Sequence, residues 1–233
     1  MNTSALAGGQ PVSLTDNGAG TQDGLASDNL SGTVTVSGTS YNLQVKDIGF
    51  SAAALNYSTF GFWQLSPSSS STNNPVEVGW YAVGSKTGST NVPSTGSANY
   101  SGKTDGAVVF NAKSTAYTFS GNAALAANFG TGTITGSLTG LNAYSVGNSS
   151  GQTNVGTLND INLTSGTISG DAFSGNAAAA ATSGSAANLS GLSGSFRGNF
   201  FGPSAQEAGG TLYMTSGSGS SMVLLEGSFG TKQ

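Results

Sequence analysis

Two aspartates, Asp160 and Asp171, are the residues that could serve as a pair of glycosidase carboxylates. Such an enzyme places one carboxyl group on each side of the bond that it cleaves. Both residues occupy polar positions of expected strands, so exposed solubilising charges are the better interpretation. The sequence contains no His and no Cys, and it has neither Gly-x-Ser-x-Gly nor a phosphate-binding loop. We therefore expect no hydrolytic or redox activity.

Metal and haem ligands are also scarce. Asp16, Asp23 and Asp28 could chelate calcium, but their spacing fits neither an EF-hand nor a nonapeptide repeat, which favours a solvated tail. Without His and Cys, an axial haem ligand would have to be a Met or one of seven tyrosines: Tyr41, Tyr57, Tyr81, Tyr100, Tyr117, Tyr144 and Tyr213. Each of these is more often a packing residue, so the residues allow haem without indicating it.

Aromatic side chains are concentrated on two neighbouring strands expected near residues 56–63 and 76–84. Adjacent residues of a strand point to opposite faces, so the pair Phe62-Trp63 places an aromatic ring on each face of the sheet. One interpretation is a packed core, and the other is a binding groove flanked by the loops Ser66–Pro75 and Ser85–Val92. The candidate ligand-binding residues are Tyr57, Phe60, Trp63, Trp80 and Tyr81.

Composition limits the cellular setting. Only 7% of residues are charged, the formal net charge is −4, and the six basic residues are scattered, so we do not expect nucleic-acid binding. No apolar run is long enough for a transmembrane helix. A chain rich in Gly, Ser, Thr and Asn, with regular apolar alternation, is typical of an extracellular β protein. The polar start after Met1 is not a signal peptide, so we expect the native targeting segment to be absent from this sequence.

Apolar residues alternate with polar ones over most of the chain, which predicts an all-β fold. We expect a flexible lead-in over residues 1–29 with one edge strand near Val12–Leu14, a small β subdomain over 30–96 and a barrel over 97–233. The expected barrel strands lie near residues 97–103, 116–128, 131–139, 157–163, 166–174, 192–200, 210–215 and 222–229. Eight antiparallel strands are enough to close a barrel that its own side chains fill.

The phase of these strands separates an apolar face from a Thr/Ser/Asn face. In residues 192–200, Phe196 and Phe200 share the apolar face, whereas Arg197 and Asn199 point the other way. An outer-membrane barrel would need an apolar outer belt. Because Phe, Leu and Ile suit a packed interior here, the pattern favours a soluble barrel with a polar exterior.

Residues 196–214 carry the most specific motif, Phe-Arg-Gly-Asn-Phe-Phe-Gly-Pro-Ser-Ala-Gln-Glu-Ala-Gly-Gly-Thr-Leu-Tyr-Met. Gly202-Pro203 should end the first strand, because proline has no N–H for the ladder. Ser204–Glu207 is long enough for one helical turn, and Gly209-Gly210 should lead into the next strand, Thr211–Thr215.

This motif resembles the signature of the C-terminal β-barrel of transferrin-binding protein B and its relatives, which include surface lipoproteins and secreted haem scavengers. Tyr-x-x-x-Gly-x-Trp at residues 57–63 and Pro-Ser-Thr-Gly-Ser-Ala-x-Tyr-x-Gly at residues 93–102 resemble the same family, so the likeness covers residues 55–229. The resemblance implies a small N-terminal β handle before an eight-stranded antiparallel barrel. It also implies a structural role for Glu207 in closing the barrel.

The functional expectation follows from that resemblance. It implies a non-enzymatic binding protein, extracellular or on the outer-membrane surface, that captures haem, iron or a host iron protein. Its expected protein partner is an outer-membrane receptor or a secretion partner. The sequence covers a single handle–barrel lobe and lacks His, which argues against transferrin binding and against His-ligated haem. The alternative is a structural or adhesive surface protein that recognises a glycan or another protein.

Overall fold

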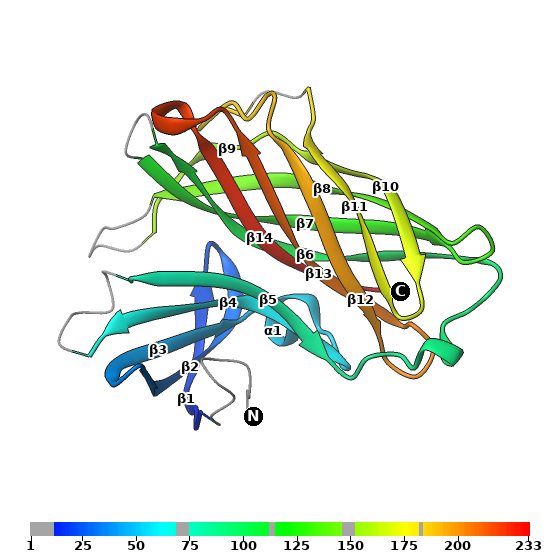
Figure 1. The fold of residues 1–233 in the computed structure, drawn as a ribbon, viewed down its shortest axis with the longest axis horizontal. Coiled ribbons are helices and arrows are strands. Elements are labelled where there is room, and N and C mark those ends of the chain that lie inside the picture. Colours follow the sequence, from blue (N-terminus) through cyan, green and yellow to red (C-terminus); the bar gives the residue numbers. More distant parts are fainter. Residues whose placement is uncertain (1–11, 69–74, 112–114, 146–151, 182–183) are drawn as a thin grey trace.

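Two antiparallel sheets contain the strands of the chain that the computed structural model describes, which comprises residues 12–68, 75–111, 115–145, 152–181 and 184–233 (Figure 1). The first sheet, the handle, has the order β1-β2-β3-β4-β5, and the short helix α1 (Gly49–Ala53) connects its third and fourth strands. The handle strands are β1 (Thr15–Gln22), β2 (Leu25–Val36), β3 (Thr39–Asp47), β4 (Ser58–Pro67) and β5 (Glu77–Gly84).

The second sheet is a barrel of eight strands in the order β10-β11-β12-β13-β14-β6-β7-β8, closed because β8 also pairs with β10. A short extra strand, β9 (Asn154–Thr157), pairs with β8 outside this ring. The ring strands are β6 (Ser97–Phe110), β7 (Thr115–Asn128), β8 (Thr133–Ser145), β10 (Ile161–Ser169), β11 (Ala172–Ala179), β12 (Ser193–Phe201), β13 (Glu207–Ser216) and β14 (Val223–Lys232). The predicted all-β fold, a β subdomain followed by an eight-stranded antiparallel barrel, is confirmed.

The barrel interior is apolar, as the alternation predicts. Phe200 is fully buried, and its ring centroid lies 5.2 Å from that of Phe173, 5.5 Å from that of Phe129 and 6.0 Å from that of Tyr100. Asn199 lies on the opposite face of β12 and is only partly buried. The phase predicted for this strand is therefore confirmed, and aromatic rings tilted against one another form the centre of the core.

The predicted lead-in over residues 1–29 is wrong for residues 15–29, because β1 and the beginning of β2 pair as an antiparallel hairpin. The edge strand is therefore β1 rather than a strand near Val12–Leu14, although Val12 is buried against the handle. Most of β1 is exposed and polar, so no alternation marks it as a strand. Residues 1–11 lie outside the described part of the chain, and the subdomain boundaries at 30 and 97 stay predictions.

Several strand boundaries also differ from the prediction. The break expected near residues 164–165 is a bulge inside β10, with Ser165 at a φ of 51°, and the turn comes at Gly170 instead. The strand expected at 97–103 continues to Phe110. Residues 204–206 form a turn rather than a helical turn, and Gly209-Gly210 lies inside β13. Gly210 occupies that strand because a Cβ there would overlap the carbonyl of Arg197.

Candidate functional site

Glu207, the first residue of β13, ties the handle to the barrel. Its buried carboxylate accepts hydrogen bonds from the backbone N–H groups of Asn56 (2.5 Å), Tyr57 (3.1 Å) and Ser58 (2.9 Å), and from the Ser58 hydroxyl (2.7 Å). These donors surround the start of β4. The expected role in closing the barrel is therefore corrected, since the carboxylate binds the handle while strand pairing closes the ring.

Phe60 fills the contact between the two units. Its ring lies against Gly230 of β14, where a Cβ would overlap the ring, and it packs with Leu55. Beside it, the Ser228 hydroxyl donates a hydrogen bond of 3.0 Å to the carbonyl of Gly61. Phe60 is 0% exposed, so it stabilises the junction and presents no surface to a ligand.

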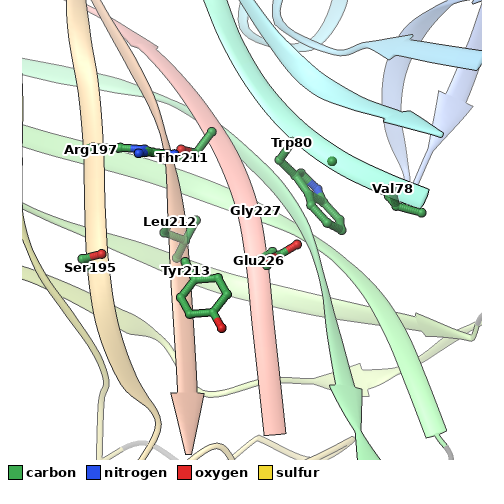
Figure 2. Close-up of a pocket in the computed structure, with 10 residues that line it drawn as sticks. Val78, Trp80, Ser195, Arg197, Thr211, Leu212, Tyr213, Glu226 and Gly227 are labelled. Atoms are coloured by element: carbon green, nitrogen blue, oxygen red, sulfur yellow. The ribbon is translucent and has the colours of Figure 1, made fainter. Parts of the chain in front are cut away.

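Trp80 stands in a cleft between β5 and the outer face of the barrel (Figure 2). It pairs across the strands with Phe62, so both side chains face the barrel, with ring centroids 6.5 Å apart. A cavity of about 460 Å³ lies beside it, lined from the barrel by Arg197, Tyr213 and Glu226 among others. Figure 2 shows the indole between β5 and the barrel strands, beside the strand that carries Glu226.

A second cavity of about 430 Å³ lies between the handle strands and β6–β7, and it shares Val78, Trp80 and Glu226 with the first. Its lining combines apolar side chains with Gln and charged residues. Three of its lining residues have a buried polar atom without a hydrogen-bond partner in the described part of the chain: Trp80 Nε1, Asp105 Oδ1 and Ser145 Oγ. The cleft thus has two chambers with a common wall.

A buried pair of carboxyl groups, Asp23 and Asp105, lies where the β1–β2 hairpin meets the barrel. Asp23 has a φ of 51° and accepts a hydrogen bond of 2.6 Å from the Thr118 hydroxyl, and its carbonyl accepts one of 2.5 Å from the Ser120 hydroxyl. Burial raises the pKa of Asp23 to about 6. Burial also raises the pKa of Asp105, and the charge of Asp23 raises it further. The sequence contains no signal for this pairing, because the two residues are far apart along the chain.

Trp63 and Tyr81 lie on the other face of the handle sheet, as the strand register requires. Trp63 covers Gly79 and borders an apolar cluster that includes Leu43 and Leu65. The Tyr81 hydroxyl donates a hydrogen bond of 3.2 Å to the carbonyl of Lys46. Burial raises the pKa of Tyr81 well above its usual range. These two aromatics are therefore structural parts of the handle's outer layer.

Tyr57 is 38% exposed, and its ring lies over Gly202 at the handle–barrel junction. Of the five candidate residues, Trp80 is the one that lines the cleft. Arg197, Tyr213 and Glu226 complete it. Sequence reasoning considered Tyr213 only as one of seven possible haem ligands, and it assigned no binding role to the other two. Their outward direction on the barrel strands was readable from the alternation, but the handle opposite them was not. In the expected loop Ser66–Pro75, residues 69–74 lie outside the described part of the chain.

The other chemical candidates are not brought together. Asp160 precedes β10 and accepts a hydrogen bond from the Gly140 N–H (3.0 Å), whereas Asp171 follows β10 near Asn199. The two carboxylates therefore lie at opposite ends of one strand, in connections rather than at strand positions. Within the described residues, no group of three or more His, Cys, Asp or Glu could hold a metal ion. No helix in those same residues has the length and apolar character needed to span a bilayer.

A comparison with family models places residues 92–233 in the group described as the C-lobe and N-lobe β-barrels of transferrin-binding protein B. Curated proteins gave no sequence match.

Among solved structures, the intact two-lobe Ap-TbpB shares 18% identity with this chain at a TM-score of 0.58, covering 97% of this chain and 40% of that one. A double mutant of TbpB from Haemophilus parasuis shares 19% identity at a TM-score of 0.59, and the match covers 100% of this chain and 41% of that one. Isotype 1 TbpB from serogroup B Neisseria meningitidis shares 19% identity at a TM-score of 0.52, and the match covers 87% of this chain and 35% of that one. At these identities the likeness shows the fold, and this chain spans about two fifths of those proteins or less.

Proposed function

This chain belongs to the family of transferrin-binding protein B β-barrels, and on that premise we propose that it is a non-enzymatic binding protein of a Gram-negative cell surface, anchored or released. Its cargo is an iron-carrying host protein of the transferrin class, which it presents to an outer-membrane receptor. The observation that carries the proposal is the handle–barrel unit, in which a barrel of this family meets a five-stranded sheet across an open cleft.

The residues of the cleft support binding to a protein. Trp80, Tyr213 and Arg197 belong to the three residue types that contribute most to interface energetics. Tyr213 is 51% exposed, and it stands on a barrel face whose other side chains are mostly short. A rigid barrel beneath the cleft keeps these side chains in place, which lowers the entropy lost on binding.

Protein cargo is favoured over haem because Tyr213 is the one candidate tyrosine that lines the cleft in the described part of the chain, and it stands on an exposed barrel face rather than in an enclosed pocket. Tyr100 is buried in the barrel, where its hydroxyl donates to the carbonyl of Ala205, whereas Tyr81 is partly buried in the handle, where its hydroxyl donates to the carbonyl of Lys46. Neither ring lines the two chambers of the cleft. A catalytic role is disfavoured because the sequence contains no His and no Cys.

The experiment is a binding assay on the immobilised chain with iron-loaded and iron-free transferrins from several vertebrates, with hemin in parallel. We expect saturable binding to at least one iron-loaded transferrin, weakened by about tenfold or more in Trp80→Ala. Val155→Ala, an exposed change on β9, is the matched control and should bind as the parent chain does.

Two results would contradict the proposal. A saturating Soret band with hemin and no transferrin binding would make haem the cargo. Capture of a glycan or of an unrelated surface protein, with both iron sources failing, would favour an adhesive role. Protease shaving of intact cells that carry the native gene checks the surface location, because an exposed protein is cleaved before the cells lyse.

A further inference from the structure

The two edges of the handle sheet differ in how they are protected. The edge strand β1 is polar and mostly exposed, and its register with β2 shifts between Asp16 and Ala19. Polar side chains and bulges of this kind discourage another strand from pairing. The opposite edge, β5, reads Glu-Val-Gly-Trp-Tyr-Ala-Val-Gly and pairs with β4 in unbroken register. It contains no Pro and no Lys, and its one charged residue, Glu77, stands at its first position, so most of this edge lacks the usual protection.

The hydrogen bonding of β5 shows which backbone groups are free. Ser85 N donates to the Tyr57 carbonyl at 2.8 Å, in line with the register of the β4–β5 pair. Alternate residues of an antiparallel strand bond to the same neighbour. The odd-numbered residues of β5 therefore bond to β4, and Val78, Trp80 and Ala82 direct their N–H and C=O groups to the other side. No strand pairs with that edge in the part of the chain that the structure describes.

A groove runs along this free edge. Its upper part is the 460 Å³ chamber beside Trp80, and its lower part is a cavity of about 370 Å³ lined by Ala82 and Lys86. The two share Arg197 and Thr211, so they adjoin each other over the outer face of β12 and β13. Beyond β5 the chain pairs with the barrel, because Thr87 N donates to the Phe200 carbonyl at 2.9 Å. This pairing closes the lower end.

Two cationic side chains and one carboxyl group, that of Glu226 in the upper chamber, line the groove, which gives it a positive balance in a chain whose net charge is −4. The cations are Arg197 and Lys86. Neither the guanidinium of Arg197 nor the ammonium of Lys86 has an ion pair or hydrogen-bond partner among the described residues. By contrast, the ammonium groups of Lys46, Lys103 and Lys232 each donate to an oxygen of the protein. Two unpaired cations beside an unpaired strand edge are complementary to an extended chain with carboxylate side chains.

We propose that this groove binds an extended, acidic segment of a partner protein, which adds to β5 as a sixth strand of the handle sheet. Backbone hydrogen bonds to β5 supply affinity, and carboxylates on Arg197 and Lys86 set the register, as in other complexes formed by strand addition. A second copy of the chain fits poorly, because its own β5 lies against its own barrel and would bring that barrel into the same space. The inference rests on the proposed function only in requiring a protein partner.

The test selects binders from a phage-displayed library of random dodecapeptides on the immobilised full chain. We expect enriched peptides that are acidic and rich in β-branched residues. The best peptide, synthesised free, should bind about tenfold or more weakly to Arg197→Gln, since a charge-assisted hydrogen bond is lost. Lys103→Gln removes one positive charge outside the groove and is the matched control, which should bind the peptide unchanged.

Backbone pairing has its own readout. Two versions of the peptide are made, each N-methylated on one set of alternate amides. If the peptide adds to β5, the version methylated on the amides that face β5 loses binding and the other keeps it. Equal behaviour of the two versions, enrichment of peptides without carboxylates, or no enrichment at all would overturn the proposal. A dimer in sedimentation experiments that the peptide disperses would assign the groove to a second copy and also overturn it.

The results of the peptide assay and of the transferrin assay can be told apart. Peptide binding without transferrin binding keeps the groove and removes the proposed cargo. Transferrin binding that is unchanged in Arg197→Gln keeps the cargo and removes the groove from its recognition.

Discussion

Glu207 of the barrel accepts two hydrogen bonds from a single handle residue, one from the backbone N–H of Ser58 at 2.9 Å and one from its hydroxyl at 2.7 Å. The same carboxylate also accepts the N–H groups of the two residues before Ser58. One buried side chain therefore satisfies three consecutive backbone donors where β4 begins, so the handle depends on the barrel for its own backbone hydrogen bonds.

Replacing that carboxylate should loosen the handle. Glu207→Ala leaves three partly buried N–H groups without their acceptor, and we expect the free energy of unfolding to fall by about 3 kcal/mol. Glu207→Gln retains one acceptor oxygen and should lose less. Urea denaturation measures both, with Glu77→Gln on exposed β5 as the control. Equal stability of all three variants would mean that water replaces the carboxylate.

Phe200→Ala should lower the free energy of unfolding by about 3–5 kcal/mol, because it leaves a cavity among three aromatic rings. Asn199→Ala, one residue away on the outer face, should cost less than about 0.5 kcal/mol. Thermal and chemical denaturation of the two variants compares them directly. Similar losses at both positions would show that the strand phase is off by one residue.

The carboxyl pair Asp23–Asp105 predicts that acid stabilises the fold. Because both pKa values are raised, the folded chain binds more protons than the unfolded chain between about pH 4 and the folded pKa of about 6 for Asp23. The free energy of unfolding should therefore fall as the pH rises through this range. Denaturation at pH 5 and pH 7.5 measures the difference.

The variant Asp105→Asn isolates the pair. Removing one charge relieves the repulsion, so the variant should gain stability at pH 7.5 and show a flatter pH dependence. Burial also raises the pKa of Asp47 and of Glu226, so some slope should remain. A slope identical to that of the parent chain would rule out the pair as its source.

The segment 97–233 should fold without the handle. Its eight ring strands share one apolar interior, and Phe60 of the handle contacts only their outer face. We expect a cooperative thermal transition for the isolated segment, at a lower temperature than in the full chain because the surface around Gly230 loses its cover. A broad, non-cooperative melt would show that the barrel needs the handle to close.

The interior of the barrel was predictable because its signal is local. Phe196 and Phe229 stand between polar or small neighbours, and period-two alternation directly reports which side of a strand is buried. The bulge at Ser165 was not predictable as such, since a serine with a positive φ gives no pattern of its own. The sequence around it therefore predicts a strand end.

The cleft was hardly predictable, because it depends on contacts between distant segments. Phe60 and Trp80 are both aromatic residues on neighbouring strands of the handle. Phe60 nevertheless packs against Gly230, whereas Trp80 lines a cavity. Asp23 looked like part of a solvated tail, and only its position against β7 buries it. Residue type indicated that the handle mattered, but docking on the barrel decided which side chains remain accessible.

The seam of the ring also governs the order in which this molecule can assemble. Ring neighbours follow one another along the chain, with only the short β9 between β8 and β10, except for β6 and β14, where the first ring strand meets the last. Bringing these ends together requires closing a very long loop, which is slow compared with forming the hairpins. The handle rests on β14 through Gly230 and Ser228, so its docking site is completed only by the last ring strand. A chain interrupted before Val223 would therefore have an open barrel with two unpaired strand edges, which promote aggregation, and its handle would lack the strand that it packs against.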